Sequence, residues 1–386
     1  MFVELHIIQN FAPSCLNRDD TNTPKDCEFG GHRRARISSQ CIKRSIRWHP
    51  VFKEKLGQEP SLRTRRARNE LAGRLIKRGF PRTQVEAAFD AFIPAALVPL
   101  SKGQTRVMLF LGHDELQKME DQLLANWDRL GPAATAVVQA NGGARQAREH
   151  LEAICGQVAK SVTSGTKAAD IALFGRMIAE RQKDEIDAAC QVAHAISTHK
   201  VIMDVDFYTA VDDLQSAADE PGAGMMGNIE FNSSCFYRYS LVDTDQLLKN
   251  LKYDYDLTRR AVEAFVHASI AAIPTGKQNS FAAHNLPAFV FITVRESGVP
   301  RSLVNAFESP VRVRPTDEQS LSEKSIRRLD AYWDRLESVY GRDGATYKKA
   351  FTLGVRDIRL ENIESAGTLH ELVRGAMEAI RLWAHC

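Results

Sequence analysis

The first residues of the chain alternate between apolar and polar side chains. Over residues 2–9, three apolar side chains fall on one side of an extended segment and two polar ones on the other: Val3, Leu5 and Ile7 against Glu4 and His6. A period of two residues is typical of a β-strand. The pattern therefore predicts a strand that is buried on one face only.

A polar stretch and then an amphipathic stretch follow this strand. Residues 12–36 are rich in turn-forming residues, with Gly30 and Gly31 near the end, and they predict a loop. Ser38 and Ser39 then begin a predicted helix that continues to residue 49, because Pro50 cannot extend it.

The middle of the chain has the composition of helices. From about residue 61 to residue 197 it is rich in Ala, Leu, Glu, Arg and Gln. The expected breaks contain Gly or Pro and fall at residues 79–81, 131–132, 142–143 and 165. We therefore predict that residues 56–194 form a helical insertion.

After the insertion the pattern returns to strands. Alternating residues 201–208 and an aromatic run at 231–239 are joined by a stretch, 212–227, that is rich in Gly and acidic residues. These segments predict a protruding hairpin over residues 204–234. The remaining pattern predicts a helix, a strand and two helices, at 257–273, 288–294, 322–340 and 368–383. We therefore predict an α+β fold in which residues 1–55 and 195–386 form one domain.

Composition excludes several classes of protein. Of the 386 residues, 44% are hydrophobic and 26% are charged, which is typical of a globular chain. No apolar run approaches the roughly 20 residues that cross a bilayer, and the first residues do not resemble a signal peptide. The seven cysteines form no Cys-x-x-Cys pair, which argues against a disulfide framework or a zinc knuckle. We expect a cytoplasmic protein without membrane contact.

Positive charge is concentrated near the N-terminus. Residues 18–68 hold 14 Lys and Arg against 6 Asp and Glu, a net charge of +8, whereas the rest of the chain holds 37 against 42. Between Phe29 and Lys53 there is no acidic residue. A basic block on an otherwise slightly acidic protein is typical of a surface that binds a polyanion.

The most informative segment, residues 30–47, lies inside this block. At 100° per residue, an amide and three cations of the predicted helix share one narrow arc: Gln40, Lys43, Arg44 and Arg47. The two serines lie at the N-cap, where backbone N–H groups favour an anion, and three arginines precede them: Arg33, Arg34 and Arg36. A solvated amphipathic helix is the ordinary explanation of such a face. The combination favours phosphate binding instead.

The sequence resembles a known family at this point. Residues 16–47 resemble the start of CasC-type backbone subunits of the type I-E CRISPR Cascade surveillance complex. The matching pieces, in order, are LNRDD, KD, FGG, RARISSQ, KR and a final Arg. The resemblance continues at residues 170–177, 194–201, 204–214, 236–239, 276–285, 305–308 and 332–335, and it is weakest between residues 51 and 165.

The resemblance implies a fold with the shape of a right hand. The palm would be ferredoxin-like (RRM-like), residues 56–194 would be helical fingers, and residues 204–234 would be a β-hairpin thumb. It also implies that copies of the subunit stack along the guide RNA. The family's RNA-contacting positions correspond here to Arg18, Lys25, Ser38, Gln40, Lys43 and Arg47, with Met177 and the thumb strand nearby.

Adjacent aromatic residues mark the thumb strand. Phe207 and Tyr208 point to opposite faces of the predicted strand. One could pack into the protein while the other stacks on or beside a base. The alternative is that both belong to the core of an ordinary hairpin. Met177 is a second apolar side chain that could wedge against RNA, and Lys277, in a sequence that departs from a P-loop, is a further phosphate contact.

We compared three hypotheses for the function. The leading one is a backbone subunit that binds guide RNA, called CRISPR RNA (crRNA). It would assemble along the crRNA with other copies of itself and other Cascade subunits, and would present the guide for pairing with target DNA in antiviral defence. We expect it to have no catalytic residue, metal or cofactor. The rival is a CRISPR-type RNA nuclease that uses the loop carboxylates Asp19, Asp20 and Asp26 with a metal. Because metal nucleases usually gather carboxylates from several elements, we expect these three to cap turns or orient arginines instead. A general single-strand binder is the third possibility.

Overall fold

The computed structural model describes residues 1–140, 145–162, 165–177, 184–210, 225–342, 344–353 and 363–380. The chain divides into two compact units. The first comprises residues 1–56, 190–245 and 259–386, and the second comprises residues 57–189 and 246–258. Within the described ranges, every helix is too short or too polar to span a bilayer.

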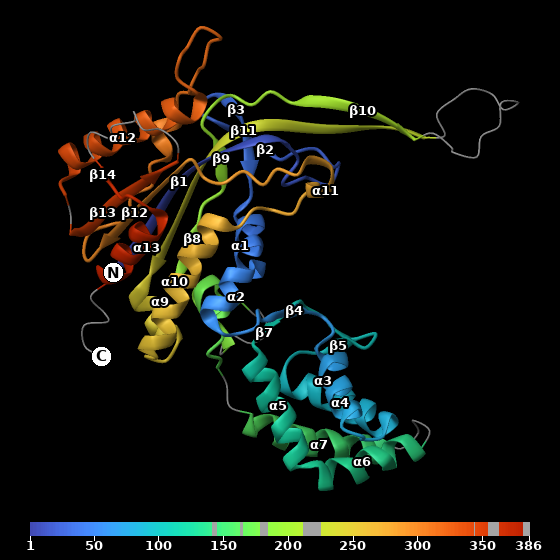
Figure 1. The fold of residues 1–386 in the computed structure, drawn as a ribbon. Coiled ribbons are helices and arrows are strands. Elements are labelled where there is room, and N and C mark those ends of the chain that lie inside the picture. The colour runs from blue at the N-terminus through green and yellow to red at the C-terminus, as the bar shows by residue number, and fades with distance from the viewer. Residues whose placement is uncertain are drawn as a thin grey trace, which may run out of the picture. The chain divides into compact units, whose positions relative to one another are not determined.

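The first unit is built on one large, mostly antiparallel sheet (Figure 1). Its strands follow the order β14-β13-β12-β1-β11-β9-β3-β2, and β8 and β10 also pair with β11. The strands are β1 (Phe2–Ser14), β2 (Asp26–Phe29), β3 (His32–Ile37), β8 (Cys190–Val192), β9 (Ala195–Ser197), β10 (Asp204–Ala210), β11 (Met225–Asp243), β12 (Phe289–Arg295), β13 (Ala345–Thr352) and β14 (Glu364–Ser365).

The first unit also contains helices, and some of them cover its central strands. The helices are α1 (Ser39–Trp48), α2 (Pro50–Leu56), α10 (Tyr255–Ala271), α11 (Gln278–Phe281), the 3₁₀ helix η2 (Val304–Phe307), α12 (Leu321–Tyr340) and α13 (Leu369–Glu378), while α9 (Thr244–Asn250) and α10 cross the division between the units. Trp333 of α12 packs on Phe291 of β12 in one hydrophobic cluster. Arg238 of β11 donates to the carbonyl of Ser269 in α10. All residues of β12 and most of β1 are buried.

The prediction that β1 is half-buried is wrong. Glu4 and His6 are fully buried, like the apolar residues between them. The Glu4 carboxylate accepts hydrogen bonds from Tyr239, Thr293, Arg295 and the backbone N–H of Arg301. Burial lowers the pKa of His6 to about 4, so its imidazole is neutral. Polar residues therefore alternate in this strand because they have buried partners and not because they face water.

The predicted loop at residues 12–36 is partly wrong. Strand β1 extends to Ser14, and β2 and β3 form a hairpin. Gly30 and Gly31 make its two-residue turn with φ of 60° and 73°, a conformation that favours glycine at both positions. A Cβ at residue 30 would lie 1.9 Å from the carbonyl oxygen of Glu308. Gly30 is therefore required both by the turn and by the close approach of this neighbouring segment.

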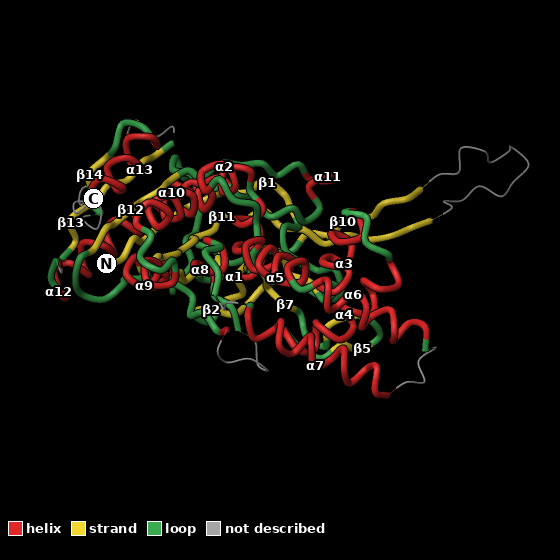
Figure 2. The backbone as a smooth tube through the Cα atoms, turned by 90° about the horizontal axis from the view of Figure 1, so that it is seen from below, coloured by secondary structure: helices red, strands yellow, loops and turns green. Residues whose placement is uncertain are grey.

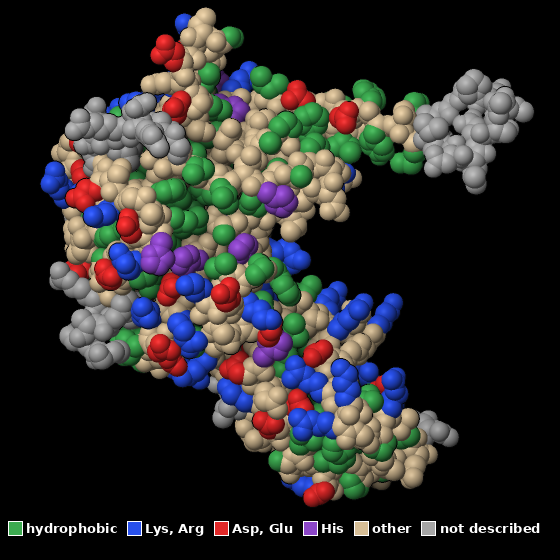
Figure 3. Space-filling view, viewed as in Figure 1, with side chains coloured by type: hydrophobic (Ala, Val, Ile, Leu, Met, Phe, Trp, Pro, Cys, Tyr) green, Lys and Arg blue, Asp and Glu red, His purple; other side chains and the backbone are tan. Residues whose placement is uncertain are grey.

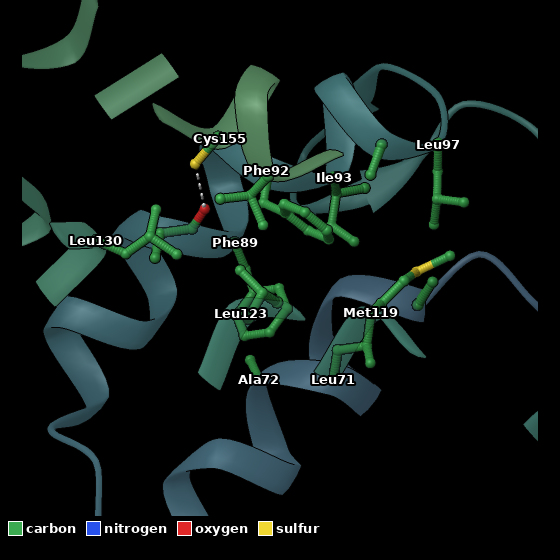
Figure 4. Packing of buried hydrophobic residues seen from close by; sticks show 14 of the residues in the cluster. Leu71, Ala72, Phe89, Phe92, Ile93, Leu97, Met119, Leu123, Leu130 and Cys155 are labelled. Carbon is green, nitrogen blue, oxygen red and sulfur yellow. Dashed lines mark hydrogen bonds between the residues drawn. The ribbon is translucent and has the colours of Figure 1, made fainter. Parts of the chain in front are cut away.

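The second unit is mainly helical, as predicted. Its helices are α3 (Ala67–Lys77), α4 (Arg82–Ala96), α5 (His113–Ala125), α6 (Trp127–Gln139), α7 (Arg145–Ser161) and α8 (Ala169–Phe174), with short strands β4 (Leu62–Thr64), β5 (Leu100–Ser101), β6 (Gln104–Thr105) and β7 (Leu109–Leu111). Figure 4 shows Phe89 and Phe92 of α4 packed among side chains of α3, α5 and α6. The thiol of Cys155 in α7 donates to the carbonyl of Ala88.

Two predictions for this region are wrong. Residues 131–132 do not break a helix, because Pro132 lies inside α6 and the break comes earlier, at Asn126. Residues 190–197, expected to be helical, form β8 and β9 of the large sheet. The predicted break at 142–143 lies outside the described residues. The second unit begins one residue after the start of the predicted insertion and ends five residues before its end, and it also takes in residues 246–258.

The predicted hairpin is present. Strand β10 pairs with the first half of β11, from Asp204 opposite Phe231 to Ala210 opposite Met225. In both views the paired strands extend away from the rest of the large sheet (Figures 1 and 2). The connection between them lies outside the described residues. The later helices and strand are also found close to their predicted positions, as α10, β12, α12 and α13.

Candidate nucleic-acid interface

The basic helix α1 begins and ends where the sequence predicts. The Ser38 hydroxyl accepts a hydrogen bond from the Cys41 N–H at 3.3 Å, and the Ser38 N–H donates to the side chain of Asn17 at 2.9 Å. This cap attaches the start of the helix to the loop after β1. At the other end, His49 is extended and Pro50 begins the short helix α2 instead of only ending α1.

The exposed face of α1 differs from the predicted arc. Gln40, Arg44 and Trp48, four residues apart, are exposed, whereas Arg47 is buried together with the two isoleucines of the helix. We therefore remove Arg47 from the candidate RNA contacts. Lys43 is partly buried and lies close to Cys190 of β8.

The sequence reasoning missed Trp48. This residue is 54% exposed, and the Arg44 guanidinium lies over its indole, 5.9 Å from the ring centroid. This is the distance of a cation–π contact. The available signal was its spacing, because an aromatic residue four positions after Arg44 and eight after Gln40 shares their face of the helix.

Arg34, another predicted contact, is a structural residue. Its side chain is fully buried and donates to the carbonyl oxygens of Ser197, Phe307 and Glu308 at 3.0, 2.8 and 3.0 Å. Burial lowers the pKa of this guanidinium from its usual value. Arg34 therefore fastens β3 to β9 and to the 307–308 segment and cannot reach a ligand in this conformation.

The two neighbouring arginines do reach the surface. Arg33 is exposed and forms an ion pair with Asp26 across the hairpin. Arg36 donates from Nε to the carbonyl of Asp26 at 3.0 Å, and its Nη1 lies 3.0 Å from Nδ1 of His194. Burial, Arg36 and Lys25 lower the pKa of His194, so its neutral ring accepts from Arg36. Arg36 is thus held in place beside the edge of the sheet.

The loop after β1 brings further cations toward α1. The Arg18 guanidinium donates to the side chain of Asn22 at 2.9 Å. Lys25 bonds through its backbone to Asn17 and Arg36, and its charge acts on Asp19, Cys41 and His194. Lys25 therefore lies between the loop, the start of α1 and β9. Lys25 as a whole is partly exposed.

Lys277 joins this surface from a distant part of the chain. It precedes α11 in a left-handed conformation, with φ of 50°. At the preceding residue, Gly276, a Cβ would lie 2.2 Å from the Leu16 carbonyl oxygen, so the two backbones are in direct contact. The charges of Arg18 and Lys277 both act on the thiol of Cys15. The structure thus places Lys277 near Arg18, although 258 residues separate them in sequence.

A groove of about 540 Å³ runs beside α1. Residues of the loop after β1, of α1 and the turn that follows it, and of the segment before α11 line this groove. The lining side chains include Asn17, Arg18, Asp19, Asn22, Cys41, Arg44, Ser45 and Trp48. Two arginines and an exposed aromatic ring therefore face a cavity on the basic surface.

The loop carboxylates have structural partners. Asp19 accepts hydrogen bonds from the hydroxyl and N–H of Thr21 and from the N–H of Thr23, and the bond from the hydroxyl holds its pKa below the usual value. Asp26 pairs with Arg33. The interpretation that these residues cap turns and orient arginines is confirmed for both, while Asp20 is exposed. In the described parts of the chain, no three His, Cys, Asp or Glu side chains are grouped to hold a metal ion.

The hairpin aromatics are not core residues. Phe207 is 80% exposed and Tyr208 is 39% exposed, with its ring against Gly227 on the paired strand. The alternative of an ordinary hairpin core is therefore wrong. The described strands 204–210 and 225–231 contain no Lys or Arg, and Figure 3 shows mostly apolar and acidic side chains along this arm. The arm is suited to apolar contacts and not to gripping phosphates.

Met177 lies in the second unit. It is 83% exposed and follows Arg176, which is buried. The Arg176 guanidinium donates to both carboxylate oxygens of Glu115 at 2.8 and 2.7 Å. A buried ion pair therefore fixes the backbone beside this exposed methionine. Such an anchor would present the thioether at the surface in a defined position.

Comparison with known proteins shows which family this fold belongs to. The family described as CT1975-like protein matches residues 3–375 of the chain. The chain belongs to this CT1975-like family. A search among curated proteins returns no match.

Two solved structures resemble this CT1975-like chain over almost its whole length. One comes from a CRISPR RNA-guided surveillance complex described as pre-nicking: it is 32% identical, with a TM-score of 0.82, and the match covers 98% of this chain and all of the other. The second, also from a CRISPR RNA-guided surveillance complex, is 26% identical with a TM-score of 0.74 and the same coverage. The resemblance inferred from the sequence motifs is confirmed.

Proposed function

We propose that this CT1975-like chain is a backbone subunit of a CRISPR Cascade complex that binds guide RNA through its phosphates without cleaving it. The observation that carries the proposal is the surface formed by Arg18, Lys25, Arg44 and Lys277, which three separate segments bring together beside α1. Its partners would be crRNA, target DNA, other copies of the chain and other Cascade subunits, in the cytoplasm. Similarity to chains of surveillance complexes supports this assignment.

The topology supports a ferredoxin-like palm. The path β1–α1–β9–β11–α10–β12 has the β-α-β-β-α-β order of that fold. Strands β12 and β11 flank β1, and β9 lies beyond β11, as in a ferredoxin-like sheet. In this assignment the second unit, inserted between α2 and β8, supplies the fingers, and the β10–β11 hairpin is the thumb.

The palm would bind RNA differently from an ordinary RRM domain. RRM domains stack bases on aromatic residues of an open sheet face. Here the central strands are buried by helices, so those faces are closed to a ligand. The cations lie instead on α1, in the loop after β1 and in the segment before α11. Contacts to phosphates position a strand without reading its sequence, so any guide could be accepted with most of its bases left for pairing.

The exposed arm favours assembly of several copies. Phe207 and Met226 are 80% and 78% exposed, and Val205 and Met225 are more than half exposed. A row of apolar side chains of this kind usually has a partner. In a filament along the RNA, the thumb of one copy would contact its neighbour or the bases between the two copies.

The RNA that copurifies with the chain and its genomic neighbours tests the proposal. Guide RNAs of one uniform length in a complex of defined mass would support a Cascade backbone subunit. RNA of mixed length bound to the isolated chain would support the general single-strand binder instead.

We expect the thumb aromatics to be dispensable for folding. The Phe207→Ala, Tyr208→Ala double variant should keep its thermal midpoint within about 2 °C, because exposed substitutions change stability by less than about 0.5 kcal/mol. It should bind fewer copies per RNA, measured by analytical ultracentrifugation with a long oligonucleotide. Phe236→Ala, which truncates a buried ring of β11, is the matched control and should lose about 3 kcal/mol or more. Unfolding of the double variant would contradict this assignment.

We expect no nuclease activity. The purified chain, incubated with Mg²⁺ or Mn²⁺, should leave single-stranded RNA and DNA intact on a denaturing gel, because Asp19 and Asp26 are occupied by turn and arginine contacts. Asp20→Ala should behave like the wild-type chain. Metal-dependent cleavage that disappears in Asp20→Ala or Asp26→Ala would establish the nuclease function instead.

A further inference from the structure

We propose that the groove beside α1 holds one nucleobase of the bound RNA, stacked on the exposed indole of Trp48. This inference rests on the proposed RNA binding and extends it from phosphate contacts to a defined base site. The first observation is Trp48 itself. The residue is about half exposed, although Trp is usually largely buried in a folded chain.

The groove has the size and walls that a nucleotide requires. Its volume of about 540 Å³ lies within the range of small-molecule sites. Arg44 lies over the indole, and Arg18 also lines the groove. A base can therefore stack on the indole while a guanidinium contacts its phosphate. Asn22 and Ser45 add polar groups that can hydrogen-bond the edge of a base or its ribose.

The end of the groove is fixed by the backbone around α1. The N–H of Val51 donates to Nδ1 of His49 at 3.3 Å, and burial lowers the pKa of this histidine. The imidazole is therefore neutral and carries its proton on Nε2. This turn joins α1 to α2 directly after Trp48, so the indole is presented from a constrained position and little entropy is lost when a base stacks on it.

The occupant is a base and not an acidic protein segment, because the groove combines a flat aromatic ring with guanidinium groups. Stacking on an aromatic ring is available to every base and is independent of sequence. The site is therefore compatible with binding of single-stranded RNA of any sequence. It adds an apolar, salt-independent contribution to binding that is otherwise ionic.

Substitution of Trp48 tests the inference in the full chain, freed of RNA, with fluorescently labelled single-stranded RNA. Trp48→Ala should weaken binding by about 5- to 100-fold, the range for loss of one stacked base, and leave the dependence of log K on log[salt] unchanged. Trp48→Phe should remain within about 3-fold of wild type, since a ring is kept. Tyr340→Ala, which removes an exposed aromatic outside the groove, should bind as wild type does.

An abasic oligonucleotide of equal length separates stacking from phosphate contact. Wild type and Trp48→Ala should bind it with the same affinity, because no base remains to stack. An equal loss on both oligonucleotides would overturn the stacking inference. The chain has four tryptophans, of which Trp383 lies outside the described residues. In a Trp383→Phe background, RNA should quench tryptophan emission, and most of this quenching should be lost when Trp48→Phe is added, because Trp333 is buried and Trp127 is partly buried.

The outcomes distinguish this inference from the proposed function. If the wild-type chain binds neither oligonucleotide, both fail. If it binds both and Trp48→Ala has wild-type affinity, only the base site fails. A change of oligomeric state in RNA-free Trp48→Ala, seen by ultracentrifugation, would assign the groove to a second copy of the chain and overturn the base site.

Discussion

Replacing Arg18, Lys25 and Arg44 together by alanine is expected to weaken binding to single-stranded RNA by about 100-fold. Each cation lies on the surface beside α1, and loss of a charged contact costs about 1 kcal/mol or more. The slope of log K against log[salt] should become shallower by about 2, since each neutralised phosphate contributes about 0.7 on a single strand. Fluorescence anisotropy at several salt concentrations measures both quantities.

A matched triple variant controls for the change in net charge. Arg335, Lys349 and Arg374 are cations on α12, β13 and α13, toward the opposite edge of the same sheet. Their replacement by alanine should leave the slope unchanged and the affinity within about 3-fold of wild type. The proposed interface would be wrong if both triple variants lost affinity equally. A loss restricted to certain RNA sequences would show that the surface reads bases and does not only grip phosphates.

The sequence alone predicts the position of helix α1 because the signals for this helix are local. The cap at Ser38 and the end of the helix before Pro50 each depend on residues within about four positions, and α1 has the predicted bounds. The hairpin at 204–234 was found for the same reason, since alternation and turn formers specify both of its strands.

Whether an individual side chain is buried or exposed depends on packing between distant segments. The local pattern of polar and apolar residues does not contain this information. Arg34 and Arg47 look like their neighbours in sequence, but both are buried in the fold. Ser197 and Phe307, which receive the donors of Arg34, lie 163 and 273 residues away from it. Glu4 and His6 were predicted to face solvent for the same reason. Trp48 was missed because a ring at the end of a helix is normally assumed to pack.

Arg34→Ala is expected to destabilise the first unit by about 3 kcal/mol. The guanidinium supplies three hydrogen bonds to buried or part-buried carbonyl oxygens, and its loss would leave these acceptors without their donor at about 1 kcal/mol or more each. One of them, the Glu308 carbonyl, also lies against Gly30 at the β2–β3 turn. The loss should therefore loosen the hairpin as well, and urea unfolding monitored by circular dichroism would measure it.

The neighbouring arginine provides the control, because Arg33 is exposed and pairs only across the surface of the hairpin. Arg33→Ala should change stability by less than about 0.5 kcal/mol, as for other exposed ion pairs. Conversely, RNA affinity per folded molecule should be unchanged in Arg34→Ala, since this side chain is closed off from any ligand. The opposite result would be an Arg34→Ala chain of normal stability that loses RNA affinity and whose slope of log K against log[salt] is shallower by about 0.7. It would show that the Arg34 side chain moves out to contact a phosphate.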